Sequence, residues 1–290
     1  MKKIFILIPI YNDWQSVSKL LNEINLNVKD LNQEFSLIIV NDSSSDQQSI
    51  NSSNFENINS IKILNMKENR GHARCIASGL KYIHEKEKYD YIIPMDGDGE
   101  DRPEEIKNFI ENVNFKPDKA IVGERVKRTE SLIFKICYKM HKAIALISTG
   151  QSIKFGNYTC LPRSTIEKMI NEKATWSSFS GALQKVEKDK VEVPSERGVR
   201  YFGPSKMSFL NLIKHSLSII SVFKFNVLIR SVLFLVVYLF LISENISNVT
   251  LIPFYLVILL NILTFYFSNR ESIEGLNNSL SNINIVDQIK

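Results

Sequence analysis

Short apolar runs alternate with helical patterns over the first 126 residues, and this alternation restricts the possible folds more than any other feature. Five runs are expected to be strands, at residues 4–10, 36–42, 61–66, 91–96 and 120–126. Between them, apolar residues recur at helical spacing, as at Val17, Leu20 and Ile24. Strand–helix alternation of this kind predicts an α/β fold, with a mostly parallel sheet covered by helices on both faces.

Acidic residues follow three of the predicted strands. Asp13, Asp42 and Asp96 each lie just past a strand end. Ligands of open α/β sheets bind beyond the carboxyl ends of the strands, so we expect these three side chains on one rim. The densest stretch is YDYIIPMDGDGEDRPEE, residues 89–105.

The Asp96-Gly97-Asp98 turn places two carboxylates on one loop, with Gly97 expected to allow the tight bend. Mg²⁺ or Mn²⁺ takes one or two carboxylates together with phosphate oxygens of a substrate. The turn therefore predicts a metal site that a diphosphate would complete. For the acids that follow, we expect helix capping at Asp101, Glu104 and Glu105.

Two apolar runs near the end of the chain, residues 225–242 and 249–267, are 18 and 19 residues long. That length crosses a bilayer, although a pair of buried core helices would show the same pattern. Residues 206–224 carry an apolar stripe flanked by lysines, which fits a helix in the membrane interface or a soluble packing helix. Lys and Arg precede the first run and are absent from the turn, so both flanking parts are predicted to be cytosolic.

The expected domains follow from these patterns. Residues 1–205 form a catalytic domain, 206–224 an amphipathic juxtamembrane helix, 225–267 a transmembrane helical hairpin, and 268–290 a loosely ordered cytosolic tail.

Charge and cysteine content exclude some classes of function. The net charge of +5 is a mild excess, which does not predict a nucleic-acid binder. Cys75, Cys137 and Cys160 are isolated, so neither a zinc site nor a disulfide framework is indicated. The apolar start contains Pro9 and no cleavage signal, which favours a first strand over a signal peptide.

Six short motifs in a fixed order resemble the family 2 glycosyltransferases with the GT-A fold. They are IPIYND, IIVNDSSSD, ENRGHARCIASG, MDGDGEDRPEE, VGER and RYFGPSK. The chain looks most like the polyprenyl-phosphate branch, which includes the dolichol-phosphate mannose synthase-like enzymes. The resemblance runs from about residue 4 to residue 206, and its membrane hairpin agrees with many bacterial members.

The resemblance implies roles for individual residues. The nucleotide-sugar site would contain Pro9, Tyr11, Asp13, Asp42, Gly71 and Asp96. The metal ligands would be Asp96, Asp98 and Glu100, and the catalytic set Asp96, Asp98, Arg125 and Arg200. The acceptor phosphate would contact Arg200, Ser205 and Lys206. From the residues alone, Gly71 between Arg70 and His72 fits an anion site or a solvent-facing turn, and Asp42 could be a simple turn cap.

The chain departs from the family at three places. Asp13 replaces the usual Glu, and Glu100 stands where relatives often have Gln, which adds negative charge near the metal. Gly156, Asn157 and Tyr158 replace an acidic residue and a Phe-Arg pair. This last departure leaves the sugar pocket undefined.

The resulting prediction is inverting, metal-dependent transfer of a sugar from a nucleotide-sugar donor to a polyprenyl phosphate. Mg²⁺ or Mn²⁺ is the expected cofactor, and the enzyme would be a multi-pass protein of a bacterial cytoplasmic membrane or its equivalent. The alternatives are a membrane-bound glycosyltransferase that acts on a hydroxyl of a glycan or lipid, and a non-catalytic nucleotide-sugar-binding protein. No nucleic-acid partner is expected, and a homo-oligomer is left open.

Overall fold

The computed structural model describes residues 1–48, 50, 55–127, 142–204 and 208–290. The chain divides into two compact units. One consists of Met1–Thr129, Lys154–Lys206 and Ser272–Lys290, and is called the sheet unit below. The other, the helical unit, consists of Glu130–Ile153 and Met207–Glu271.

An eight-stranded sheet organises the first unit, in the order β7-β5-β6-β4-β1-β2-β3-β8. The strands are β1 (Lys2–Ile10), β2 (Gln33–Asn41), β3 (Ser60–Met66), β4 (Tyr91–Pro94), β5 (Ala120–Lys127), β6 (Phe155–Pro162), β7 (Lys190–Glu196) and β8 (Ile283–Gln288). Neighbours β4, β1, β2 and β3 run parallel, as do β5 and β7, whereas β6 and β8 are antiparallel to their partners. The predicted mostly parallel α/β sheet is confirmed. Strands β6, β7 and β8 were not predicted from the sequence pattern.

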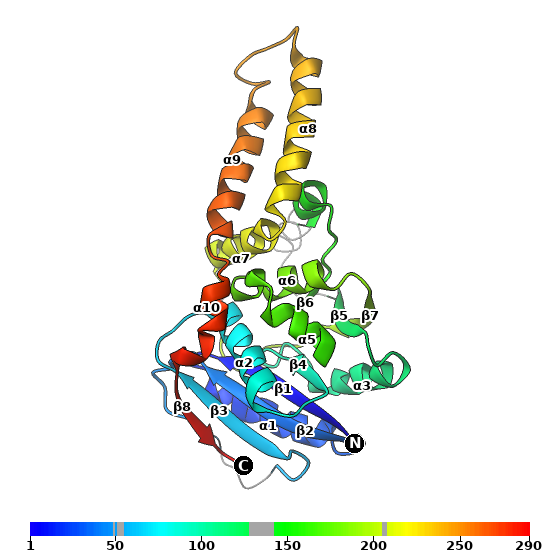
Figure 1. The fold of residues 1–290 in the computed structure, drawn as a ribbon, viewed down its shortest axis with the longest axis vertical. Coiled ribbons are helices and arrows are strands. Elements are labelled where there is room, and N and C mark those ends of the chain that lie inside the picture. The colour runs from blue at the N-terminus through cyan, green and yellow to red at the C-terminus, as the bar shows by residue number, and fades with distance from the viewer. Residues whose placement is uncertain (49, 51–54, 128–141, 205–207) are drawn as a thin grey trace. The chain divides into compact units, whose positions relative to one another are not determined.

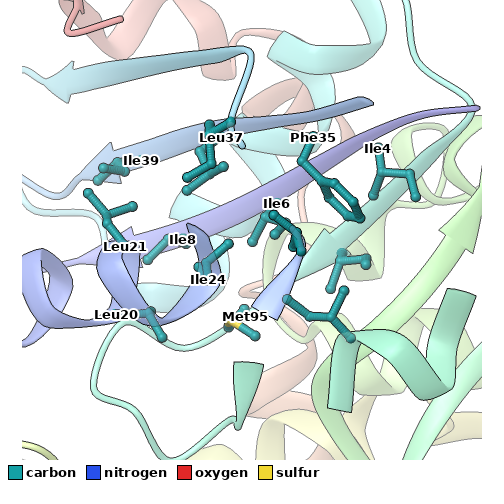
Figure 2. Packing of buried hydrophobic residues seen from close by; sticks show 14 of the residues in the cluster. Ile4, Ile6, Ile8, Leu20, Leu21, Ile24, Phe35, Leu37, Ile39 and Met95 are labelled. Carbon is teal, nitrogen blue, oxygen red and sulfur yellow. The ribbon is translucent and has the colours of Figure 1, made fainter. Parts of the chain in front are cut away.

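Helices cover both faces of this sheet. Ile4, Ile6 and Ile8 of β1 belong to the core shared with α1 (Trp14–Asn27) and α3 (Ile106–Phe115), and Figure 2 shows part of this packing. On the other face, α2 (His72–Lys86) comes so close that a Cβ on Gly79 would lie 2.3 Å from Leu7. Because both faces are covered, β1 is apolar almost without alternation.

Shorter helices complete the sheet unit. They are η2 (Pro103–Glu105), α5 (Arg163–Ile170), η3 (Lys173–Trp176), α6 (Phe179–Val186), α10 (Ile273–Asn277) and η4 (Ser279–Asn282).

The C-terminal residues are ordered, contrary to the loosely ordered tail expected for 268–290. Leu276 of α10 is buried against Ala77 and Trp176, and β8 pairs with the edge strand β3 (Figure 1). The Asn/Ser-rich composition concealed a strand because strand formation depends on an available partner edge more than on intrinsic preference.

The helical unit contains α7 (Phe209–Ser221), α8 (Lys224–Ile242) and α9 (Ile252–Ser268), with a further helix at residues 142–149. By length and composition, α8 and the helical stretch that starts at Ile252 could each cross a membrane. They lie side by side in Figure 1, and Asn261 donates a hydrogen bond to Ser231 Oγ at 2.8 Å. Small polar side chains therefore lie between the helices while large apolar ones face outward, as with Phe240 at 79% exposure.

Polar side chains of α8 hold the helix at 142–149. Asn226 donates to the carbonyl of Thr149 at 3.2 Å, and Arg230 donates to that of Ile147 at 3.3 Å. Carbonyls in the last turn of a helix lack intrahelical partners and carry partial negative charge, so both contacts are favourable.

Candidate functional site

The carboxyl ends of β1, β2 and β4 bring the predicted acids to one rim. Asp13 follows β1, Asp42 follows β2, and the turn at residues 96–99, called the acid turn below, follows β4. Parallel pairing puts the same ends of these strands at the same edge. The expected clustering is therefore present, and the side-chain contacts below connect it.

Asp96 contacts two residues that the sequence analysis did not assign to the site. Its Oδ1 lies 2.9 Å from Nε2 of His72 and accepts a hydrogen bond from Asn157 at 3.3 Å. Burial opposes ionisation of Asp96, but His72, Arg125 and Asn157 together lower its pKa. In turn, Asp96 raises the pKa of His72 against the effect of burial. Each group therefore favours the charged form of the other.

Arg200 bridges Asp98 to Asp13. Its Nη1 donates to Asp98 Oδ2 at 2.8 Å, and its Nη2 pairs with Asp13 Oδ2. All three side chains are less than 20% exposed, so solvent screens the bridge only weakly. Burial and the neighbouring Asp96 raise the pKa of Asp98 to about 6, although Arg200 opposes this.

Glu100 does not join Asp96 and Asp98 as the predicted third metal ligand. Its carboxylate pairs with Arg197, a residue absent from the predicted site. Within the described part of the chain, no three His, Cys, Asp or Glu side chains converge to hold a metal. The structure therefore brings together two of the three predicted ligands.

The glycines of the acid turn have different tasks from those expected. Gly99 has φ +86°, a conformation that L-residues rarely adopt, so it makes the bend assigned above to Gly97. Gly97 is instead a packing glycine, because a Cβ there would lie 3.0 Å from Val17. The amide of Tyr201 donates to the carbonyl of Asp98 at 2.9 Å, which fixes the turn from outside.

The Gly156-Asn157-Tyr158 departure has a structural explanation. A Cβ on Gly156 would lie 2.6 Å from the Arg125 guanidinium, so glycine leaves room for that side chain. Asn157 bonds to Asp96, and Tyr158 donates to the carbonyl of Arg102 at 2.7 Å. The position of residue 157 among the family motifs was the available sequence signal. The antiparallel pairing of β6 with β4 was needed to show that Asn157 lies beside Asp96.

Asp42 connects two loops through its side chain. Its two carboxylate oxygens accept the backbone N–H groups of Arg70 at 2.7 Å and Gly71 at 2.8 Å. Asp42 is 3% exposed, and Gly71, with φ +90°, precedes the first residue of α2. This is neither the local turn cap nor the solvent-facing Gly71 turn considered above.

The remaining predicted residues divide into two groups. Pro9 lies in β1 opposite Val40, and Tyr11 is 47% exposed just beyond that strand. Ser205 and Lys206 lie outside the described residues.

The expectation for the later acids is right in part, because Glu104 and Glu105 lie in the first turn of η2, but no side chain caps that helix. Asp101 Oδ2 accepts a hydrogen bond from the backbone N–H of Asp96 at 2.9 Å. Asp101 does not cap the helix that follows. Glu105 accepts the hydroxyl of Ser195 at 2.6 Å and so joins the start of α3 to β7. Burial and Asp96 raise the pKa of Asp101 to about 8. The local pattern could not show that the buried backbone of the turn competes for this carboxylate.

Comparisons with known proteins give the same fold. The model of the family Glycosyl transferase family 2 matches residues 5–175. Glucosyl-3-phosphoglycerate synthase from Mycobacterium tuberculosis, solved with Mn²⁺, UDP-glucose and phosphoglyceric acid, superposes with a TM-score of 0.53 at 12% identity, over 79% of each chain.

TarS from S. aureus, in complex with UDP-GlcNAc, superposes with a TM-score of 0.50 at 13% identity. The alignment covers 96% of this chain and 90% of the TarS chain. At such identities these two likenesses concern the fold. The family match spans more than half of the chain and includes most of β1, the Asp42 loop, the acid turn and Asn157. The chain therefore belongs to glycosyl transferase family 2 and has a GT-A fold.

Proposed function

We propose that this glycosyltransferase moves a sugar from a nucleotide-sugar donor to a polyprenyl phosphate at the cytosolic face of a membrane, with inversion at the anomeric carbon. The observation that carries the proposal is the combination within one chain of the Asp96–Asp98 and Arg200 cluster with the apolar pair α8 and α9. The first suits phosphate chemistry, and the second would bring it to a lipid.

The residues of the acid turn fit a divalent metal. Asp96 and Asp98 supply carboxylates from one turn, and no described residue donates a hydrogen bond to Asp96 Oδ2. Burial and the crowding of negative charge raise the pKa of Asp98 and of Asp101. A hard cation would relieve this crowding. When bound with a nucleoside diphosphate, Mg²⁺ or Mn²⁺ would supply Lewis-acid stabilisation of the leaving group.

The solved structures support the donor class. Glucosyl-3-phosphoglycerate synthase was solved with Mn²⁺ and UDP-glucose, and TarS with UDP-GlcNAc. For this chain we assign donor binding to Pro9, Tyr11, Asp13, Asp42 and Gly71, which lie on or beside the rim. His72 and Asn157 would hold Asp96 in a fixed orientation.

The acceptor's own chemistry limits what the protein must supply. A phosphate monoester has a second pKa of about 6, so its oxygen is already nucleophilic at neutral pH. That oxygen would attack the anomeric carbon as the bond to the nucleoside diphosphate breaks, and no general base is required. Arg125 and Arg200 would offset the repulsion between the two phosphates, since a guanidinium binds phosphate in a fork. Ser205 and Lys206 remain proposed acceptor contacts.

The helical unit supports a membrane location. The polar side chains of Ser231 and Thr264 are inside and the apolar ones outside, the reverse of a soluble bundle. We therefore propose that 225–267 is a transmembrane hairpin, 206–224 an interfacial helix, and 1–205 with the C-terminal segment cytosolic.

The test uses washed membranes that contain the protein, Mn²⁺, a polyprenyl phosphate and a panel of labelled nucleotide sugars. Protein-dependent label in the organic extract, stable to mild base and labile to mild acid, is the expected result. Label in glycan or in another lipid would instead establish the hydroxyl-acceptor reaction. Binding of a donor without any transfer would leave the non-catalytic alternative.

A further inference from the structure

We propose that Asp287, in the C-terminal strand β8, is a positioning residue for the donor-binding loop that carries Asp42. The proposal rests on the donor site described above. It gives a function to residues 272–290, which return to the sheet unit after the second apolar helix.

A chain of side-chain hydrogen bonds runs from β8 to the donor rim. Asp287 Oδ2 accepts from Asn65 Nδ2 at 2.7 Å. Asn65 Oδ1 accepts from Asn41 Nδ2 at 2.8 Å, and Asn41 Oδ1 accepts from the N–H of Ser44 at 3.0 Å. The relay crosses three neighbouring strands and ends in the loop that begins at Asp42.

The carboxylate sets the direction of this relay. An amide can donate or accept at either end after a flip, whereas an ionised carboxylate only accepts. Asp287 therefore makes Asn65 present Nδ2 to β8 and Oδ1 to Asn41. Asn41 must then donate to Asn65 and present its own Oδ1 to Ser44. Without the carboxylate, both amides could reverse. The backbone N–H of Ser44 would then face Nδ2 of Asn41, a donor, and would lose its acceptor.

The loop at the end of the relay needs such support. Ser43 has φ +58° and Asn12 has φ +50°, conformations that cost energy in residues other than glycine. Hydrogen bonds hold both: Ser44 Oγ accepts the N–H of Asn12 at 2.9 Å, and Asn12 Oδ1 accepts that of Ser45 at 2.8 Å. Displacement of Ser44 would thus be transmitted to Asn12, next to Asp13.

The same C-terminal segment also holds the second donor loop. Lys67 donates its backbone N–H to the carbonyl of Asn282 at 2.8 Å, and its Nζ to the carbonyl of Ser281 at 2.7 Å. Three residues later, Arg70 and Gly71 bind Asp42. A cavity of about 500 Å³ lies between this loop and the segment, lined among others by Arg70 and Asn278. The C-terminal segment therefore contacts the loop at 67–71 directly and reaches the loop that begins at Asp42 through Asn65 and Asn41.

The test measures binding of UDP and of GDP, each with Mn²⁺, to the full-length protein in detergent by titration calorimetry. For the nucleotide that the wild type binds more tightly, Asp287→Ala should raise Kd about fivefold, the usual effect of one lost hydrogen bond. Asp287→Asn retains an acceptor oxygen but no longer fixes the direction of the relay, so its Kd should lie between those of the wild type and Asp287→Ala. In turnover, Asp287→Ala should raise the donor KM and leave kcat almost unaltered.

Two further variants separate positioning from general stabilisation of the strand. Gln288→Ala changes an exposed neighbour on β8 and should leave Kd unchanged. Asn65→Ala should match Asp287→Ala, and the double variant should be no worse than either one, because both break the same relay. Thermal unfolding of each variant reports on folding.

The proposal is overturned if Asp287→Ala binds as the wild type does, or if Gln288→Ala weakens binding equally. Failure of the wild type to bind either nucleotide would overturn the donor site itself, and this outcome is distinct from a difference between variants.

Discussion

At the scale of single residues, Arg200 has the most consequential position on the rim, because it holds Asp13 and Asp98 together. Each carboxylate belongs to a loop after a different strand, so the guanidinium joins the β1 end to the β4 end of the rim. Its fork of donors serves two carboxylates here and suits a phosphate equally well. Arg200 thus connects the predicted donor and acceptor contacts.

Asp98→Asn should abolish sugar transfer while the protein stays folded. The amide oxygen can still accept a hydrogen bond from Arg200, so the local contact survives. The side chain loses the negative charge that a metal needs. We expect kcat/KM to fall at least about 100-fold, by analogy with loss of one electrostatic catalytic group. Initial rates with Mn²⁺ and circular dichroism check both parts.

Glu111→Gln is the matched control for that change. It also removes one carboxylate, but from the exposed face of α3, where Glu111 pairs only loosely with Lys107. It should retain full activity. Normal turnover by folded Asp98→Asn protein would contradict the assigned role of Asp98.

In EDTA, stability should fall as pH rises from 5 to 8. Asp98 and Asp101 have folded-state pKa values of about 6 and about 8, above the ordinary 3.8, so the folded state binds more protons across this range. The raised pKa of His72 acts in the same direction. Under linkage, the free energy of unfolding then decreases with pH.

Mn²⁺ should counteract this loss, and raise the melting temperature more at pH 8 than at pH 5, because protons and metal compete for the same carboxylates. Differential scanning fluorimetry at the two pH values, with and without Mn²⁺, measures the effect. A melting temperature that rises from pH 5 to pH 8 in EDTA would show that these carboxyls are not held protonated.

At the scale of elements, the acid turn is shaped by its neighbour segment. The backbones of Gly198 and Tyr201 bond to the carbonyls of Glu100 and Asp98, and the Tyr201 ring lies against Gly99. The segment at 197–201 thus shapes the turn that carries the carboxylates, in addition to supplying Arg200.

Gly99→Ala should destabilise the protein more than Gly203→Ala. Both glycines have positive φ, so both changes incur the backbone cost of about 1–2 kcal/mol. At Gly99 the new Cβ would also lie 2.5 Å from the Tyr201 ring, whereas nothing lies within 4 Å at Gly203. Urea unfolding of the two variants compares them, and equal losses would show that the ring moves aside without cost.

At the scale of the whole molecule, the chain passes between its two units more than once. The sheet unit comprises three stretches of chain, and the last of them follows the two apolar helices. The hairpin is consequently an insertion before the edge strand β8. The final strand can pair with β3 only after the apolar helices have been made, which ties completion of the sheet to the synthesis of these helices.

The proposed topology predicts a labelling pattern in intact cells, on a background without Cys137. Asn248→Cys, in the turn between α8 and α9, should react with a membrane-impermeant maleimide from outside. Asn277→Cys, on α10, should react only after lysis. Cys75 and Cys160 are buried, so they should not react and can stay in the background protein. The reverse pattern would place the sheet unit on the outer side.

The sequence alone determined the parallel strands β1 to β5, the common rim for Asp13, Asp42 and Asp96, and the two apolar helices. These features rest on apolar periodicity and on the rule that parallel strands end at one edge, both of which are local or general. The motifs also placed the chain in the right family.

Only the tertiary structure decided the partners of each charged group. Glu100 pairs with Arg197, both only partly exposed, instead of joining the predicted metal ligands. Asp101 is buried and accepts the backbone N–H of Asp96, since a buried polar group needs a partner. It also decided that the C-terminal residues form β8, since an Asn/Ser-rich segment becomes a strand when an edge such as β3 is available. Contacts between residues 222 positions apart, as between Asn65 and Asp287, leave no local pattern that could reveal them.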